Sequence, residues 1–229
     1  MRVLVIAAHP DDPEFFAGGT IARWCAEGHT VHYLIATGGE KGSDRSDVSP
    51  EQLRATRQEE QRRAAALLGV QHVHFLDFTD GELTNTLEVR RALVRFIRSL
   101  QPDAVLTLDP LTWHYGGTRI NHTDHRTIGA AACDAIFPAS GNPLYFPELL
   151  REGFAPYTPK QVFFAGAAQP TLLMDVTAFV EQKLAAICAH QSQVTDPQAV
   201  RQRVLRAMLR RLADGRVCYV EALRCVWLA

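Results

Sequence analysis

The chain has 229 residues, of which 47% are hydrophobic and 21% charged, which is typical of one globular α/β domain, so we expect a single domain over residues 1–229. The formal net charge of −1 provides no basic surface, which argues against nucleic acid or an anionic membrane as a partner and favours a small-molecule substrate. The five cysteines are odd in number and include no CxxC pair, which argues against a disulfide framework and a thiolate zinc site.

The first half of the chain alternates buried-strand patterns with helical patterns. Strands are predicted over residues 3–8, 30–36, 73–76 and 104–108, and helices over residues 18–27, 50–69 and 87–100. Ser49 followed by Pro50 is typical of a helix start, and Gly28 and Gly69 are typical of helix ends. Because parallel strands need crossover helices, this alternation predicts an α/β fold: a Rossmann-like, doubly wound, mostly parallel sheet with helices on both faces.

The second half of the chain is less regular. Residues 137–159 are rich in proline and lack periodicity, so we expect an irregular segment near the site, which would set pocket specificity together with the loops of residues 38–49 and 113–121. Beyond it, strands are predicted over residues 162–164, 171–175 and 217–226, and helices over residues 177–190 and 197–212. The apolar run of residues 3–8 is too short to span a bilayer, and the residues after it do not resemble a signal-peptide cleavage region, so we expect a cytoplasmic protein.

Two clusters of metal-binding side chains follow predicted strands. Residues 9–12 (His-Pro-Asp-Asp) come directly after the first strand, and residues 122–125 (His-Thr-Asp-His) lie beyond the strand that ends at Leu108. The carboxyl ends of parallel strands share one edge of the sheet, where the catalytic loops of such folds gather. A catalytic zinc site uses three protein ligands, often imidazoles and carboxylates, and leaves a position for water, a set that His9, Asp12 and His125 would supply.

Each cluster also has a simpler interpretation. A His-Pro-Asp-Asp segment can be a turn whose aspartates bond their own backbone, and His-x-x-His at a helix start can be an exposed pair. The occurrence of both clusters after predicted strands favours the metal site. The polar turn that contains Gly38, Gly39 and Gly42 allows close backbone approach to a sugar, or is an ordinary surface turn.

A set of further motifs extends over nearly the whole chain. The motifs are Ala8-His-Pro-Asp-Asp-Pro-Glu14, Thr37-Gly-Gly-Glu-Lys-Gly42, Arg57 with Glu60, Leu68-Gly-Val70, Asn121-His-Thr-Asp-His-Arg126, Asp175-Val-Thr-Ala-Phe-Val-Glu-Gln-Lys183 and His190-Gln-Ser-Gln193. In this combination the chain resembles the LmbE-like, or PIG-L-type, metal-dependent N-acetylglucosaminyl deacetylases. The resemblance implies a zinc-dependent amide hydrolase that removes the acetyl group of an N-acetylated amino sugar or a related small molecule.

The resemblance also implies roles for single residues. His9, Asp12 and His125 would bind Zn²⁺, with another divalent metal such as Fe²⁺ as an alternative. Asp11 falls on the position of the family's catalytic base, although spacing alone does not separate its role from that of Asp12. His122 falls on the histidine that stabilises the developing oxyanion.

Four further positions complete the expected site. Asp124 falls on the orienting partner of the oxyanion histidine, and Arg57 and Asp80 fall on positions that contact substrate in the family. Gly39, in the polar turn, is our third candidate for substrate binding. Glu14 has no assigned role, and His190 either caps its helix or borders the pocket.

These groups suit amide hydrolysis because an amide carbonyl is a poor electrophile and its nitrogen a poor leaving group. Zinc polarises the carbonyl and lowers the pKa of bound water to about 7, so zinc-bound water is the expected nucleophile. Asp11 would accept the proton of that water as general base and return it to the leaving nitrogen as general acid. Protonated His122, oriented by Asp124, would stabilise the oxyanion.

Other classes of function fit less well. A nucleotide-dependent oxidoreductase or transferase lacks GxGxxG or GxxxxGK[ST] after the first strand, and a serine hydrolase lacks GxSxG. A non-catalytic regulatory or binding protein that keeps the fold and the metal stays open, because fold does not dictate function, but the presence of Asp11, His122 and Asp124 favours an enzyme. The expected partner is a small N-acetylated substrate, with the acyl acceptor unspecified, and association into a homo-oligomer is open.

Overall fold

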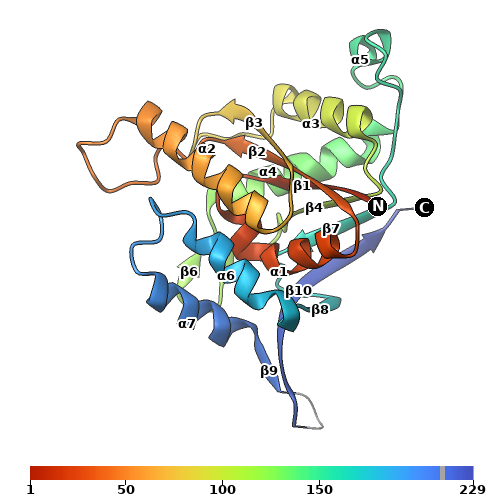
Figure 1. Ribbon diagram of the computed structural model, residues 1–229. Helices are drawn as coiled ribbons and strands as arrows, with labels where there is room; N and C mark the ends of the chain where they lie inside the picture. Colours follow the sequence, from red (N-terminus) through yellow and green to blue (C-terminus); the bar gives the residue numbers. More distant parts are fainter. Residues whose placement is uncertain (212–214, 229) are drawn as a thin grey trace.

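The computed structural model describes residues 1–211 and 215–228 and has a central mixed sheet (Figure 1). Its strands lie in the order β3-β2-β1-β4-β7-β10-β8, and β9 pairs with β10. The pairs β3–β2, β2–β1, β1–β4 and β4–β7 are parallel, whereas β10 runs antiparallel to β7, β8 and β9. The strands are β1 (Arg2–Ala7), β2 (Thr30–Thr37), β3 (His72–Phe78), β4 (Ala104–Leu108), β7 (Gln161–Ala165), β8 (Leu172–Asp175), β9 (Leu209–Arg211) and β10 (Val217–Trp227).

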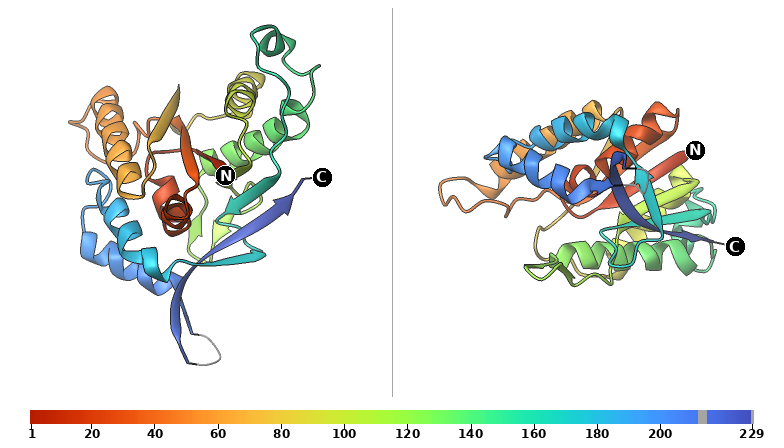
Figure 2. Two further views of the ribbon diagram at one scale, coloured as in Figure 1. Left: turned by 45° about the vertical axis from the view of Figure 1, so that its right-hand side comes forward. Right: turned by 90° about the horizontal axis from the view of Figure 1, so that it is seen from below.

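Helices cover both faces of the sheet (Figures 1 and 2). On one face α6 packs against α1 and α2, and on the other α3 packs against α4. The helices are α1 (Asp12–Ala26), α2 (Pro50–Leu67), α3 (Leu87–Leu100), α4 (Thr123–Asp134), α5 (Pro147–Arg151), α6 (Val180–Cys188) and α7 (Pro197–Met208). Short helical turns η1 (Ala135–Ser140) and η2 (Thr177–Phe179) precede α5 and α6, and a small hairpin joins β5 (His114–Tyr115) to β6 (Arg119–Ile120). The predicted fold class, α/β with a mostly parallel sheet, is confirmed.

The parallel strands form the centre of the core. Every residue of β1 from Val3 to Ala7 is buried, as is all of β4. Strands buried on both faces read as continuous apolar runs, which is why their positions could be predicted from the sequence. The loops that follow their carboxyl ends lie at one edge of the sheet. These loops contain residues 9–12, residues 37–42 and, after the small hairpin, residues 121–125.

The predicted start of the first helix, at Gly18, was wrong: α1 begins at Asp12. The helix is kinked at Ala17, where φ is −146°, so residues before the kink do not follow a single helical period. Two consecutive glycines after the kink lower helix propensity, but they serve close packing, since a Cβ at Gly19 would lie 2.7 Å from the Val176 side chain.

Other boundaries also differ from the prediction. The predicted helix over residues 197–212 ends earlier, because α7 stops at Met208 and β9 follows, pairing with β10; Leu212 lies outside the described residues. The helix predicted to start at residue 177 begins as the turn η2 before α6. Residues 137–159, expected to form an irregular segment near the site, contain the end of η1 and the short α5, and none of them lines the cavity that holds the two clusters. Of α4, only a helix start at the second cluster was expected, without bounds.

Among the residues that the structure describes, no helix combines the length and hydropathy needed to cross a bilayer. The five cysteines are free thiols, and only Cys218 is buried.

Candidate active site

The loop after β1 is organised by Asp12, the first residue of α1. Its Oδ2 atom accepts hydrogen bonds from the backbone N–H groups of Ala8 (3.1 Å) and His9 (2.9 Å). Its Oδ1 atom lies 3.0 Å from Nε2 of His125. The simpler turn interpretation and the ligand interpretation are therefore compatible, because one carboxylate oxygen binds the turn while the other faces the second cluster.

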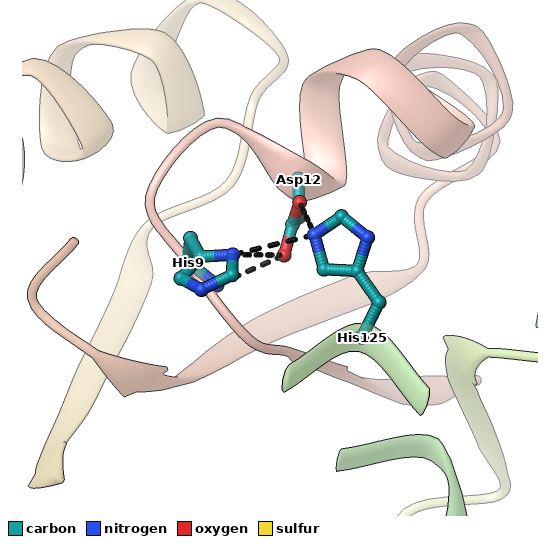
Figure 3. Close-up of side chains that lie close together, drawn as sticks. All are labelled: His9, Asp12 and His125. Carbon is teal, nitrogen blue, oxygen red and sulfur yellow. Dashed lines mark hydrogen bonds and ion pairs between the residues drawn. The ribbon is translucent and has the colours of Figure 1, made fainter. Parts of the chain in front are cut away.

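The three expected metal ligands converge (Figure 3). Nδ1 of His9 lies 3.3 Å from Nε2 of His125 and 3.5 Å from Oδ2 of Asp12, and the ligand atoms of the three residues all lie within 4.8 Å of one another. His9 and Asp12 are buried and His125 is half-buried. Two imidazoles and one carboxylate form a donor set that suits a divalent transition metal with an open coordination position.

Oxygen atoms of other side chains lie against the second ring nitrogen of each of the two imidazoles. Nε2 of His9 lies 3.0 Å from Oδ1 of Asp80 and 3.2 Å from Oδ2 of Asp124. Nδ1 of His125 lies 2.9 Å from Oδ1 of Asn121. Oxygen partners on the second nitrogen of a metal-binding histidine fix its ring and its tautomer, so this arrangement fits a divalent metal held by the facing nitrogens.

Negative charge surrounds His9. Burial alone would lower the pKa of His9, but hydrogen bonds to Asp12, Asp124 and Asp80 outweigh it and raise the pKa well above its usual value. An imidazole that faces three carboxylates marks a position where a positive charge is strongly favoured. A metal ion would supply that charge and leave His9 neutral, as a ligand must be.

Asp11 lies beside the convergent ligands in an unusual backbone conformation. Its φ of 95° falls in the left-handed region, which costs a non-glycine residue about 1–3 kcal/mol unless neighbours compensate. Nη2 of Arg57 donates to the backbone oxygen of Pro10 (2.6 Å) and to Oδ2 of Asp11 (3.2 Å). Burial raises the pKa of Asp11 to about 6, although the Arg57 guanidinium opposes the shift. A carboxylate with a pKa near neutrality is suited to general acid–base chemistry.

His122 and Asp124 occupy the start of α4. Nδ1 of His122 accepts the backbone N–H of Asp124 (3.2 Å), and the ring packs edge-on against His9 with 4.6 Å between centroids. Burial lowers the pKa of His122, and the neighbouring His9 lowers it further. The Asp124 carboxylate bonds His9 and the backbone N–H of Gly81 (2.7 Å). The expected protonation of His122, and its orientation by the Asp124 carboxylate, stay predictions.

The expected substrate-contacting residues lie at the same edge of the sheet. Arg57 and Asp80 are buried and line the cavity, and Oδ2 of Asp80 accepts the backbone N–H of Lys41 (3.0 Å). Gly39 has a φ of 67°, and a Cβ there would lie 2.5 Å from the Arg57 guanidinium. Because its carbonyl accepts a hydrogen bond from Arg57 (2.9 Å), Gly39 supports Arg57, and it does not line the cavity.

These residues surround a cavity of about 780 Å³. Phe15, Phe16 and Arg203 also line it and were not expected from the sequence, whereas Tyr115, Arg119 and Ile120 belong to the expected pocket loop of residues 113–121. Phe15 and Phe16 follow the first cluster directly, so their proximity to it was a usable signal. Arg203 comes from α7, whose position relative to the site depends on the tertiary fold. His190 does not line the cavity and lies fully buried beside Glu14.

A family model described as PIG-L, GlcNAc-PI de-N-acetylase, matches residues 4–136. The chain belongs to the PIG-L family. The matched segment runs from β1 into η1 and contains both clusters. Relatives of this PIG-L chain are N-acetylglucosamine-type deacetylases, which are amidohydrolases, so the predicted family and class of enzyme are confirmed.

Similar proteins support this membership over most of the PIG-L chain. It is 38% identical over 192 residues to the diacetylchitobiose deacetylase of Thermococcus kodakarensis, a match that covers 84% of this chain and 70% of that protein. The structure of N,N'-diacetylchitobiose deacetylase from Pyrococcus horikoshii, complexed with an inhibitor, superposes with a TM-score of 0.86 at 30% identity, covering 98% of this chain and 83% of that one.

A third structure shows how far the fold extends. The 4-carboxy-2-hydroxymuconate hydratase GalB from Pseudomonas putida superposes with a TM-score of 0.80, covering 100% of this chain and 97% of that one. Its identity to the PIG-L chain is 22%, so the likeness concerns the fold alone. Function therefore has to be argued from the site.

Proposed function

We propose that this PIG-L family protein is a zinc-dependent N-deacetylase that hydrolyses the acetamide group of an N-acetylglucosamine-type small molecule. The observation that carries the proposal is the convergence of His9, Asp12 and His125 within 4.8 Å, with Asp11 beside them in one cavity. A convergent triad in a cavity next to a carboxylate of raised pKa is the arrangement expected of a metal-assisted hydrolase.

His9, Asp12 and His125 would hold the metal, through the nitrogen and oxygen atoms that face one another. When bound, a divalent metal supplies Lewis acidity to the amide carbonyl and lowers the pKa of a coordinated water. The mixed nitrogen and oxygen donor set favours Zn²⁺, and Fe²⁺ is the alternative because it accepts the same ligands.

Asp11 would carry the proton during the reaction. Its carboxylate faces the cavity and is held by Arg57, so it can take a proton from the attacking water. In the second half of the reaction it would donate that proton to the departing nitrogen. The pKa of about 6 suits both steps, because the group is mostly ionised at neutral pH yet still basic enough to accept a proton.

The remaining residues would bind and orient the substrate. His122 faces the cavity next to His9, where its ring can bind the carbonyl oxygen as negative charge develops on it, with Asp124 proposed to orient that ring. Arg57 and Asp80 would contact the sugar, and Gly39 would hold Arg57 in place through its carbonyl. A cavity of about 780 Å³ is large enough for a sugar with a substituent.

The non-catalytic alternative is less well supported. A regulatory protein that only binds metal has no need of a base with a pKa shifted towards neutrality. Both Asp11 and His122 line the cavity beside the convergent ligands, so the groups that the chemistry requires are present together.

Acetate release tests the proposal. Zinc-loaded and chelated protein would be incubated with N-acetylglucosamine, its disaccharide and N-acetylglucosaminyl glycosides, and acetate would be quantified. We expect acetate from at least one compound, loss of activity on chelation and recovery on adding Zn²⁺ or Fe²⁺. The His125→Ala variant is the matched control, since it removes one metal ligand and leaves the rest of the cavity wall unchanged. Turnover that persists in chelated protein would sink the metal-dependent mechanism.

A further inference from the structure

A series of hydrogen bonds leads from His190, which follows the C-terminal end of α6, to the backbone of Asp11. Nε2 of His190 lies 3.2 Å from Oε2 of Glu14, and Oε1 of Glu14 accepts a hydrogen bond from Nε2 of Gln61 (2.9 Å). Oε1 of Gln61 accepts the backbone N–H of Asp11 (2.8 Å). Three side chains that are distant in sequence therefore connect to one peptide group beside the expected metal ligands.

The three side chains of this series are completely removed from solvent. His190, Glu14 and Gln61 each have an exposed fraction of 0%. A buried carboxylate is costly unless it is paired, and Glu14 uses one oxygen for His190 and the other for Gln61. Because Glu14 can only accept, it fixes the Gln61 amide with its nitrogen towards Glu14 and its oxygen towards Asp11.

Asp11 needs such support because its backbone is in the left-handed region, with φ of 95°. Helix α2 supplies two restraints from residues one turn apart, which lie on the same helix face. Arg57 binds the Asp11 carboxylate and the Pro10 carbonyl, and Gln61 binds the Asp11 peptide nitrogen. The carboxylate and the backbone of the same residue are thus held separately.

We propose that Gln61, fixed by Glu14 and His190, is a positioning residue that holds Asp11 in the conformation needed for proton transfer. This inference rests on the proposed function, because it presumes that Asp11 is the base. Asp12 has its own hydrogen bonds to the backbone of Ala8 and His9, so the metal ligand keeps its position when Gln61 is changed. Gln61 therefore acts on turnover and not on metal binding.

The test compares Gln61→Met with Gln58→Met. Methionine matches the length of glutamine but neither donates nor accepts as an amide does, and Gln58 lies on the same helix with its hydrogen bond directed to Asp77 (3.2 Å), away from Asp11. For Gln61→Met we expect kcat to fall about 10- to 100-fold, the loss that a small misplacement of a catalytic group causes. KM, zinc content and the visible spectrum of the cobalt-substituted protein should stay those of the wild type, and Gln58→Met should keep its kcat.

The backbone contact itself provides a readout that does not depend on turnover. In the wild type we expect the Asp11 amide proton to be protected from hydrogen exchange, and in Gln61→Met we expect that protection to be lost. Amide exchange followed by nuclear magnetic resonance measures both. A wild-type Asp11 amide that exchanges at the rate of an unstructured peptide would overturn the proposal.

The outcomes separate this proposal from the function on which it rests. Wild-type protein that releases no acetate from any substrate contradicts the proposed function. An active wild type with a Gln61→Met kcat within threefold of it overturns the positioning role, as does a kcat loss that follows zinc loss in proportion. If Gln61→Met does not fold, Glu14→Leu decides: it leaves Gln61 in place without its anchor, and an unchanged kcat in that variant overturns the proposal.

Discussion

Asp11 has a strained, left-handed backbone conformation and also carries the carboxylate proposed as the general base. The left-handed conformation is least costly for glycine, asparagine and aspartate, and an asparagine there keeps the shape while removing the base. We expect Asp11→Asn to bind zinc at the wild-type ratio and to lose about 10²–10⁴-fold in kcat. Metal analysis and acetate-release kinetics on the same preparation check this. Loss of zinc with retained turnover would refute the division of roles between Asp11 and Asp12.

The same substitution should stabilise the metal-free protein. The folded-state pKa of Asp11, about 6, lies above the usual value near 4, so the ionised carboxylate opposes folding. The penalty is fully present above about pH 7 and absent below about pH 3, because there the group is protonated in both states. We therefore expect Asp11→Asn to raise the free energy of unfolding by about 3 kcal/mol at pH 8 and by almost nothing at about pH 3. Urea unfolding at the two pH values measures the difference, and an equal effect at both would contradict it.

The sequence allowed the ligand residues to be predicted because each of them lies next to a readable strand or belongs to a recognisable motif. The contacts between those residues and the rest of the chain could not be predicted in the same way. Gln61 has no motif of its own, and its contact with Asp11 spans 50 positions. The Asp124 carboxylate likewise bonds His9, 115 positions away, a partner that only the tertiary fold determines.

Helix α1 illustrates the competition between helix propensity and packing at the scale of an element. A Cβ at Gly19 would lie 2.7 Å from the buried Val176 side chain, so Gly19→Ala overpacks the contact, which costs about 1–3 kcal/mol. Alanine's higher helix propensity offsets up to about 1 kcal/mol of that cost. We expect Gly19→Ala to lower the free energy of unfolding by about 1–2 kcal/mol.

A double-mutant cycle identifies the cause of that loss. In a Val176→Ala background the added methyl group has room, so Gly19→Ala should cost less there or become stabilising. Urea unfolding of the four proteins provides the coupling energy. Equal costs in both backgrounds would show that the contact with Val176 does not explain the glycine.

Element boundaries were predicted less well than the elements themselves. The strands β1, β2 and β4 were located because burial on both faces makes them continuous apolar runs. The end of α7 was placed too late, because the residues of β9 continue a polar, arginine-rich pattern and pair with β10 for tertiary reasons. The extent of helix α4 was not predicted, beyond its start at the second cluster, because its small, weakly amphipathic sequence carries little periodicity.

For the molecule as a whole, the pattern of predicted strands and helices did not determine the direction of every strand in the sheet. Alternation of strands and helices predicted a parallel sheet over the first half of the chain and its catalytic edge, whereas the order β3-β2-β1-β4 comes from the structure. The long β10 runs antiparallel to β7 and β8, although α6 and α7 lie between β8 and β10 in the chain, so strand–helix alternation did not predict its direction. The expected cytoplasmic location and the question of a homo-oligomer stay predictions.

The fold also brings cations from distant parts of the chain to the cavity mouth. Arg119 in β6 and Arg203 in α7 are exposed and line the cavity, and neither guanidinium group has a hydrogen-bond or ion-pair partner among the residues that the structure describes. The carboxylates deeper in the cavity, by contrast, have partners: Asp11 bonds Arg57, and Asp80 bonds His9. We therefore expect a substrate whose acyl acceptor carries an anionic group to bind better than a neutral one of the same shape.

A matched pair of substrates tests this expectation. The carboxymethyl and carbamoylmethyl glycosides of N-acetylglucosamine, in both anomers, differ in charge and hardly in size. We expect Arg203→Gln to raise KM for the carboxymethyl compound by up to about fivefold, the range of an exposed ion pair, and to leave KM for the carbamoylmethyl compound unchanged. Arg206→Gln is the control, because Arg206 lies on the same helix but bonds Gln202 outside the cavity. The difference should shrink in high salt, since exposed charges are screened, and an equal change in KM for both compounds would show that Arg203 contributes shape and not charge.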